Sequence, residues 1–144
     1  MNEKTTGVTI LLAEDDEDDA LLIRDAAKEA GFGDDLKLVA DGQELLDYLK
    51  RRGKYADESA WPFPDLILLD LNMPRKDGRE ALREIRTDSK LQHLPVVVLT
   101  TSQQEEEIVR SYDLGVAGYV VKPPSFEALV GIMKALGDYW LQAG

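Results

Sequence analysis

Short apolar runs alternate with amphipathic stretches along the chain. Five runs rich in leucine and β-branched residues end abruptly at polar residues, and these runs are residues 8–13, 36–40, 65–69, 94–99 and 119–121. Apolar runs of this length predict strands that are buried on both faces of a sheet. Residues 54–64, which contain two prolines and three aromatic side chains, are predicted to form a loop.

The segments between and after these runs carry apolar residues at helical spacing. The expected apolar face of the first helix consists of Leu22, Ile23, Ala26, Ala27 and Ala30. Gly31 is expected to end this helix. In the second segment, Asp41 and Glu44 resemble a capping box, and Gly53 is expected to end the helix. The apolar face of this second helix includes Leu45, Leu46 and Leu49.

Three more helices follow. One is expected around residues 79–86, after a turn-rich stretch at residues 72–78. Ser102 is expected to cap the next helix, which Gly115 closes and whose apolar residues are Ile108, Val109 and Tyr112. Ser125 opens the last helix, whose apolar stripe consists of Phe126, Leu129, Val130, Met133, Leu136 and Trp140. Strands that alternate with helices through short connections predict an α/β fold, with a parallel sheet covered by helices on both faces.

The composition fits one globular domain and narrows its chemistry. A chain of 144 residues matches a single domain and can form a core without disulfides. Because there is no cysteine, thiol nucleophiles and cysteine-ligated metal sites are excluded. A net charge of −11 disfavours nucleic acid and anionic membranes as partners. No signal peptide or transmembrane segment is evident, so the cytoplasm is the expected location.

Acidic residues follow the first and third predicted strands. Glu14 and Asp15 come directly after the first strand, and Asp70 comes after the third. Because ligands of parallel sheets bind at the carboxyl ends of the strands, these carboxylates are expected to converge. Such hard oxygen ligands suit Mg²⁺. The alternative for Asp70 is an ordinary strand-end turn that continues through Asn72 and Pro74.

The fourth and fifth strands lead to Thr100 and Lys122. A lysine at this edge is a point charge suited to phosphate oxygens, and a cis peptide before Pro123 would aim it into the site. Taken singly, Thr100 is an ordinary strand-terminal residue, Lys122 is a surface lysine, and acids 17–19 are a solvated helix start. The order of acid pair, acid, hydroxyl and lysine, each at its own strand end, favours a site for Mg²⁺ and a phosphoryl group.

Four motifs together resemble the receiver domain of response regulators. They are AEDD at the first strand, LLDLNMPRKDG at the third, VVVLTTS at the fourth and GYVVKP at the fifth. The resemblance covers residues 8 to about 141 and implies one receiver domain over residues 1–144, without an output domain. It also implies a doubly wound, flavodoxin-like fold whose five strands lie in the order 2-1-3-4-5.

The resemblance assigns roles to the residues at the strand ends. It implies that Asp70 is phosphorylated, and that the ligands of Mg²⁺ are Asp15, Asp70 and the main-chain carbonyl of Asn72. Glu14 would contact the ion through water.

By the same resemblance, Thr100 and Lys122 contact the phosphoryl group, and Tyr119 takes the aromatic switch position. Phosphorylation is expected to draw Thr100 inward and let Tyr119 turn from exposed to buried. This movement would change the face formed by the fourth helix, fifth strand and fifth helix. The chain departs from the family at Thr101, where a smaller residue is usual and which borders the path of the phosphoryl group.

The implied function is two-component signalling. The domain would accept a phosphoryl group from a phosphohistidine of a sensor kinase and catalyse only its own phosphorylation and dephosphorylation. A narrower resemblance, to single-domain regulators paired with bacteriophytochrome kinases, depends on the long loop before the third strand, LTTS, and the terminal GDYWL. Expected partners are therefore such a sensor histidine kinase, a histidine phosphotransfer protein, and a second copy of the chain docked through the last helix.

Three other functions compete with this one. They are a phosphorelay intermediate, an inactive receiver-like binding module, and a phosphatase of the haloacid dehalogenase type. The phosphatase would carry its nucleophile after the first strand in a DxD pair, whereas here Asn72 occupies the second position of the pair. The complete acid, hydroxyl and lysine set argues against the inactive module. His93, the one histidine, is expected to be a surface residue.

Overall fold

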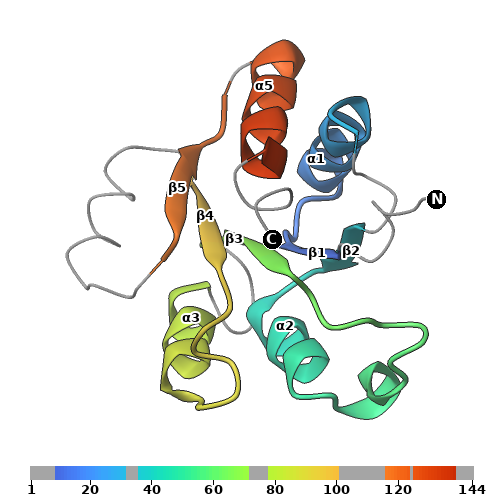
Figure 1. Ribbon diagram of the computed structural model, residues 1–144, viewed down its shortest axis with the longest axis vertical. Helices are drawn as coiled ribbons and strands as arrows, with labels where there is room; N and C mark the ends of the chain where they lie inside the picture. Colours follow the sequence, from blue (N-terminus) through green and yellow to red (C-terminus); the bar gives the residue numbers. More distant parts are fainter. Residues whose placement is uncertain (1–8, 32–35, 72–77, 101–115, 124, 139–144) are drawn as a thin grey trace.

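The computed structural model describes residues 9–31, 36–71, 78–100, 116–123 and 125–138, with Thr100 described by its backbone. A sheet of five parallel strands forms its centre (Figure 1). The strands are β1 (Ile10–Ala13), β2 (Leu36–Val39), β3 (Leu66–Asp70), β4 (Val96–Thr100) and β5 (Gly118–Val121). Their spatial order is β2-β1-β3-β4-β5, which confirms the predicted sheet and strand order.

The strand register brings the carboxyl ends of β1 and β3 side by side. Ala13 pairs with Val39 on β2 and with Leu69 on β3, so the next residues are Glu14 on one strand and Asp70 on the other. The chain order reverses here, because β2 and β3 lie on opposite sides of β1. Ligands of open parallel sheets bind in the crevice at such a reversal.

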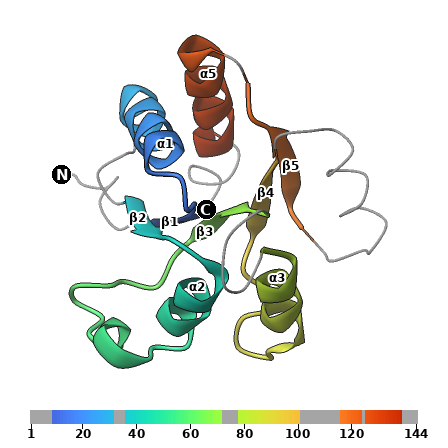
Figure 2. The same cartoon turned by 180° about the vertical axis from the view of Figure 1, so that it is seen from behind.

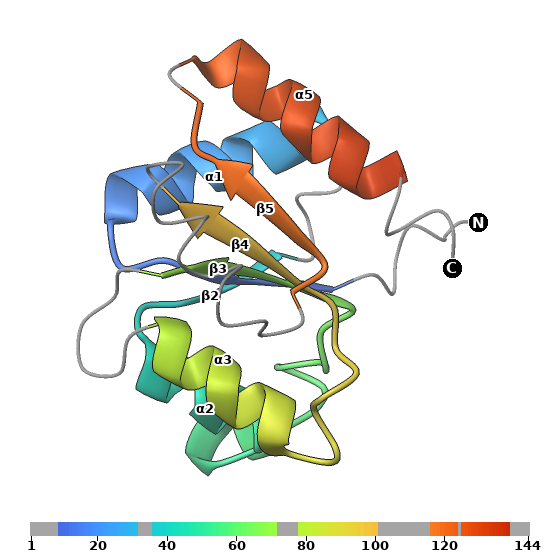
Figure 3. The same cartoon turned by 90° about the vertical axis from the view of Figure 1, so that its left-hand side faces the viewer.

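Helices cover both faces of the sheet, as predicted. The helices on one face are α1 (Glu17–Glu29) and α5 (Phe126–Leu136), and those on the other are α2 (Gly42–Leu49) and α3 (Gly78–Thr87) (Figure 3). Consecutive strand residues alternate between the two layers. Leu11 packs with α2 and α3 and Leu12 with α1 and α5, and both are fully buried. Seen from behind in Figure 2, β2 and β5 lie at the two edges of the sheet.

The buried stripe of α1 differs from the predicted face because it includes Ala20 and excludes Leu22. The stripe consists of Ala20, Ile23, Ala26 and Ala27. Leu22 is 47% exposed, so its assignment to the apolar face is wrong. The reason is that an α-helix turns about 100° per residue, which carries Leu22 outside the stripe. Gly31 follows the C-cap Ala30 with a φ of 104°, which confirms the expected helix stop.

α2 ends before Gly53, the residue predicted to end it. Lys50 is the C-cap, and Arg51 makes the left-handed turn with a φ of 61°. Gly53, with a φ of 57°, instead opens the 3₁₀-helix η1 (Gly53–Ala56) inside the predicted loop. The prediction failed because side-chain contacts of Arg51, described below, hold a non-glycine residue in this conformation.

The predicted N-caps of α2 and α5 are present. The Asp41 carboxylate accepts the Glu44 N–H at 2.8 Å, and the Ser125 hydroxyl accepts the Ala128 N–H at 3.1 Å. These bonds satisfy amides that have no partner within the first turn of a helix.

The apolar stripe of α5 is confirmed in its middle and wrong at its start. Leu129 and Met133 are buried against the sheet, whereas Phe126 is 36% exposed in the first turn. Trp140 and the predicted fourth helix from Ser102 to Gly115 lie outside the described residues. Within the described ranges, no helix is both long and apolar enough to cross a membrane.

Candidate functional site

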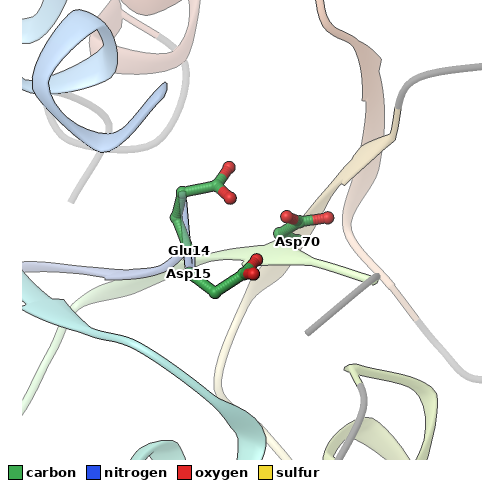
Figure 4. A group of neighbouring side chains, drawn as sticks. All are labelled: Glu14, Asp15 and Asp70. Carbon is green, nitrogen blue, oxygen red and sulfur yellow. The ribbon is translucent and has the colours of Figure 1, made fainter. Parts of the chain in front are cut away.

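Three carboxylates meet at the carboxyl ends of β1 and β3. Glu14, Asp15 and Asp70 each contribute a carboxylate oxygen, and these oxygens lie within 4.8 Å of one another (Figure 4). The backbone fixes this arrangement, because the Glu14 N–H donates to the Val39 carbonyl at 3.0 Å and extends the ladder between β1 and β2. The predicted convergence of the three acids is therefore present.

The three acids differ in their access to solvent. Glu14 and Asp70 are buried, with 2% and 5% of their surface exposed, whereas Asp15 is exposed. Burying an ionised carboxylate is costly unless a cation or hydrogen bonds compensate. The site thus has two buried carboxylates and is open to solvent on the side of Asp15, where a cation can enter.

Lys122 supplies the one positive charge that the described residues bring to this cluster. Its Nζ donates to Glu14 Oε1 at 2.6 Å, and it lies 3.7 Å from Asp70 Oδ2. The lysine follows β5, and Thr100 at the end of β4 pairs with Val121, the residue before the lysine. The peptide bond between Lys122 and Pro123 is trans, since the described residues contain no cis bond.

The electrostatics reflect an excess of negative charge. Burial, followed by a hydrogen bond with Asp70, raises the pKa of Glu14 to about 7, while Lys122 opposes the rise. Burial alone would lower the pKa of Lys122, but its hydrogen bond to Glu14 and the charge of Asp70 outweigh burial and raise it. The lysine is therefore held protonated, and it faces more carboxylates than it can neutralise.

Other predicted residues are placed only in part. Asn72, like Thr101, lies outside the described residues, and the side chain of Thr100 is not described. Tyr119 is partly buried and packs against the core layer of α2 and α3. His93 is exposed, as expected.

Asp19 takes part in the site in a way that the sequence pattern does not predict. The pattern places it in a solvated helix start, yet its Oδ2 accepts a hydrogen bond from Lys122 Nζ at 3.2 Å. Asp19 lies in the first turn of α1, and no spacing in the sequence indicates that this turn meets the end of β5. Glu17 and Asp18 do lie in the first turn of α1 as predicted.

Gly78 is a second residue that sequence reasoning missed. It begins α3, and its N–H donates to the Leu71 carbonyl at 2.9 Å. A Cβ at this position would lie 2.5 Å from the backbone oxygen of Asp70 and 2.7 Å from the Cα of Leu71. The absent side chain therefore lets α3 start directly against the end of β3.

The donor set fits a hard divalent cation. All three converging groups are carboxylates, which Mg²⁺ and similar ions prefer over nitrogen or sulfur ligands. Excess negative charge and the exposed Asp15 provide both the attraction and the entry path. The residues present thus match an oxygen-ligated metal site.

Comparison with known proteins agrees with this geometry. The sequence profile of the response regulator receiver domain matches residues 10–134. The response regulator Rcp1 of Synechocystis sp. is 37% identical over 141 residues, which cover 98% of this chain and 94% of Rcp1.

Solved structures show the same likeness. The phosphorylated cyanobacterial phytochrome response regulator RcpA has a TM-score of 0.83 and 42% identity, covering 95% of this chain and 96% of RcpA. The Mn²⁺-bound form of Rcp1 has a TM-score of 0.77 and 37% identity, with coverage of 95% and 96%. The chain belongs to the response regulator receiver domains, signalling modules that interact with sensor kinases and bind a divalent metal ion.

Proposed function

We propose that Asp70 accepts a phosphoryl group from a phosphohistidine of a sensor kinase. The observation that carries this proposal is its position: Asp70 ends β3 beside the acid pair, with its Oδ2 3.7 Å from Lys122 Nζ. In the step, a carboxylate oxygen of Asp70 attacks phosphorus and forms a P–O bond. The P–N bond to histidine breaks, and the imidazole leaves with the electron pair and takes up a proton. The product is an acyl phosphate.

Mg²⁺ is the proposed ion at this site. Its ligands would be Asp15, Asp70 and the main-chain carbonyl of Asn72, with Glu14 acting through water. When bound, Mg²⁺ supplies neutralisation of the charge on the phosphoryl oxygens. The convergence of the three carboxylates and the Mn²⁺-bound form of Rcp1 support a divalent site of this kind.

Lys122 and Thr100 would bind the transferred group. Lys122 Nζ is already 3.7 Å from Asp70 Oδ2, so an oxygen of a phosphoryl group on Asp70 falls within its reach. The Thr100 hydroxyl would take another oxygen. A phosphoryl group adds about −1.5 to −2 charges, which strengthens its bonds with Lys122 and draws Thr100 inward. The same groups would position water for dephosphorylation, so the domain would catalyse both reactions on itself.

The signal would leave the site through Tyr119. Movement of Thr100 would let this partly buried ring turn inward, and the face of the fourth helix, β5 and α5 would change. The changed face would pass the signal on in one of two ways. It would form a homodimer through α5, or it would dock a histidine phosphotransfer protein that takes up the phosphoryl group. We assign residues 1–144 to one receiver domain. Because the chain belongs to the receiver family, we set aside the alternative of a haloacid dehalogenase-type phosphatase.

The proposed input is a bacteriophytochrome kinase. Rcp1 and RcpA support this pathway, since RcpA is a cyanobacterial phytochrome response regulator and both span nearly this whole chain. The test is transfer from a purified, autophosphorylated bacteriophytochrome kinase, and we expect the label to move to this chain. If acetyl phosphate labels the chain and the kinase does not, the phytochrome pathway is wrong while the phosphoacceptor function stands.

Replacement of the acceptor tests the phosphoacceptor function itself. Wild-type protein and Asp70→Asn are incubated with acetyl phosphate and Mg²⁺, and intact mass is measured. We expect one labile phosphoryl group on the wild type and none on the variant, because an amide is not a phosphoryl acceptor. Asp25→Asn, at an exposed position of α1, is the matched control and should label normally. Equal labelling of wild type and Asp70→Asn would show that Asp70 is not the phosphoryl acceptor.

A further inference from the structure

The peptide group between Val39 and Ala40 is hydrogen-bonded to the backbone of Glu14. The Glu14 N–H donates to the carbonyl of Val39 at 3.0 Å, and the Ala40 N–H donates to Glu44 Oε1 at 2.7 Å. The Val39 carbonyl and the Ala40 amide belong to the same planar peptide unit. Its orientation is therefore set by Glu44 on one side and is passed to Glu14 on the other.

Glu44 departs from the predicted capping box in a way that serves this peptide. In a capping box the glutamate reaches back to the N-cap amide, here that of Asp41. Asp41 does cap α2, but the Glu44 carboxylate bonds instead to Ala40, the residue before the N-cap. Its second oxygen, Oε2, accepts a hydrogen bond from the Tyr55 hydroxyl at 2.8 Å. The carboxylate is thus held from both oxygens.

Tyr55 can hold the Glu44 carboxylate in one position because burial and ring contacts fix the tyrosine itself. The residue is 4% exposed. Its ring centroid lies 4.9 Å from that of Tyr48 and 5.1 Å from that of Trp61. Arg51 Nη1 donates to the carbonyl of Tyr55 at 3.2 Å and also to the carbonyl of Trp61. The segment after α2 is therefore packed around the tyrosine that reaches Glu44.

We propose that Tyr55 is a positioning residue for Glu14. Through the Glu44 carboxylate and the Val39–Ala40 peptide, its hydroxyl fixes the backbone of Glu14, and with it the carboxylate that binds Lys122. This inference rests on the proposed function, because Glu14 matters through the metal and phosphoryl site. Groups behind the direct ligands orient those ligands and tune the affinity of a metal site.

Removal of one hydroxyl tests the proposal. Tyr55→Phe keeps the packed ring and breaks the bond to Glu44. In metal-free protein we expect faster hydrogen exchange at the Glu14 amide. By calorimetry we expect Mg²⁺ to bind about two- to fivefold more weakly, as the loss of part of one hydrogen bond predicts. Glu44→Ala should give the same two changes, because it removes the shared carboxylate.

Tyr48→Phe is the matched control. Tyr48 belongs to the same ring cluster, but its hydroxyl donates to the Pro62 carbonyl at 2.6 Å and does not reach Glu44 in the described structure. We expect normal Glu14 exchange and Mg²⁺ affinity in this variant. Unchanged exchange and affinity in Tyr55→Phe, or equal changes in Tyr48→Phe, would overturn the proposal. Neither readout involves phosphorylation, so a chain that is never labelled at Asp70 would refute the proposed function and leave this result intact.

Discussion

Two cations of similar exposure, Lys122 and Arg51, have opposite kinds of partners. Their side chains are 18% and 22% exposed. Lys122 lies among the carboxylates of Glu14, Asp19 and Asp70, so formal negative charge exceeds positive charge around it. Such an arrangement is stabilised further when a cation binds, and it changes when charge is added.

Arg51 binds neutral groups instead. Its guanidinium donates to two backbone carbonyls, and its Cζ lies 5.9 Å from the ring centroid of Tyr48 and 5.5 Å from that of Phe63. Its ion pair with Glu58 spans 4.0 Å to a carboxylate that is 80% exposed, and such pairs contribute little. Charge imbalance therefore marks the reactive region, whereas satisfied neutral bonds mark the region that supports it.

Exchange of each cation for methionine is the strongest test of this contrast. Lys122→Met should slow phosphorylation by acetyl phosphate about 10²- to 10³-fold, because one donor to the developing charge is lost. Arg51→Met should label at the normal rate but lose about 2 kcal/mol of unfolding free energy, because two carbonyls lose their donor. Labelling rates and urea unfolding measure the two effects. A normal rate in Lys122→Met, or a slow one in a folded Arg51→Met, would contradict the contrast.

Several parts of this contrast could be predicted from the sequence. Glu14, Asp70 and Lys122 each follow a strand, and in a parallel sheet the chain topology alone brings strand ends to one edge. The topology of the backbone therefore allowed contacts to be predicted between residues that lie more than fifty positions apart in the chain. The continuous apolar runs likewise predicted strands buried on both faces, and hence a layer of helices on each side of the sheet.

Other contacts depend on side chains whose placement no pattern specifies. Asp19 was missed because its bond to Lys122 depends on how α1 meets the end of β5. Arg51 was missed because glycine is the usual left-handed residue, and the carbonyls that hold Arg51 come from a loop without periodicity. The bond from Tyr55 to Glu44 depends on the same loop.

Two glycine substitutions test whether the backbone of the reactive region depends on the close approach of α3 to the end of β3. Gly78→Ala puts a Cβ 2.5 Å from the Asp70 oxygen, so we expect a loss of about 1–3 kcal/mol in unfolding free energy and slower labelling of Asp70. Gly131→Ala is the control, since it lies within α5 and its new Cβ would meet no atom within 4 Å. This control should gain about 0.5–1 kcal/mol. Equal unfolding energies for the two variants would show that the close approach of α3 to β3 is unimportant.

Alkaline pH gives the smallest effect and tests the supporting region alone. Burial, followed by the hydrogen bond to Glu44, raises the pKa of Tyr55 above its ordinary value near 10. The folded state thus keeps a proton that the unfolded state releases, so the stabilisation is complete below pH 10 and is lost as the pH rises above it. Wild type should lose about 1 kcal/mol more unfolding free energy than Tyr55→Phe between pH 9 and 11, because phenylalanine does not titrate. Urea unfolding across that range measures the difference. Parallel pH profiles for the two proteins would mean that the Tyr55 proton is no better held in the folded state than in the unfolded one, and the hydroxyl would then be too weakly bound to support Glu44.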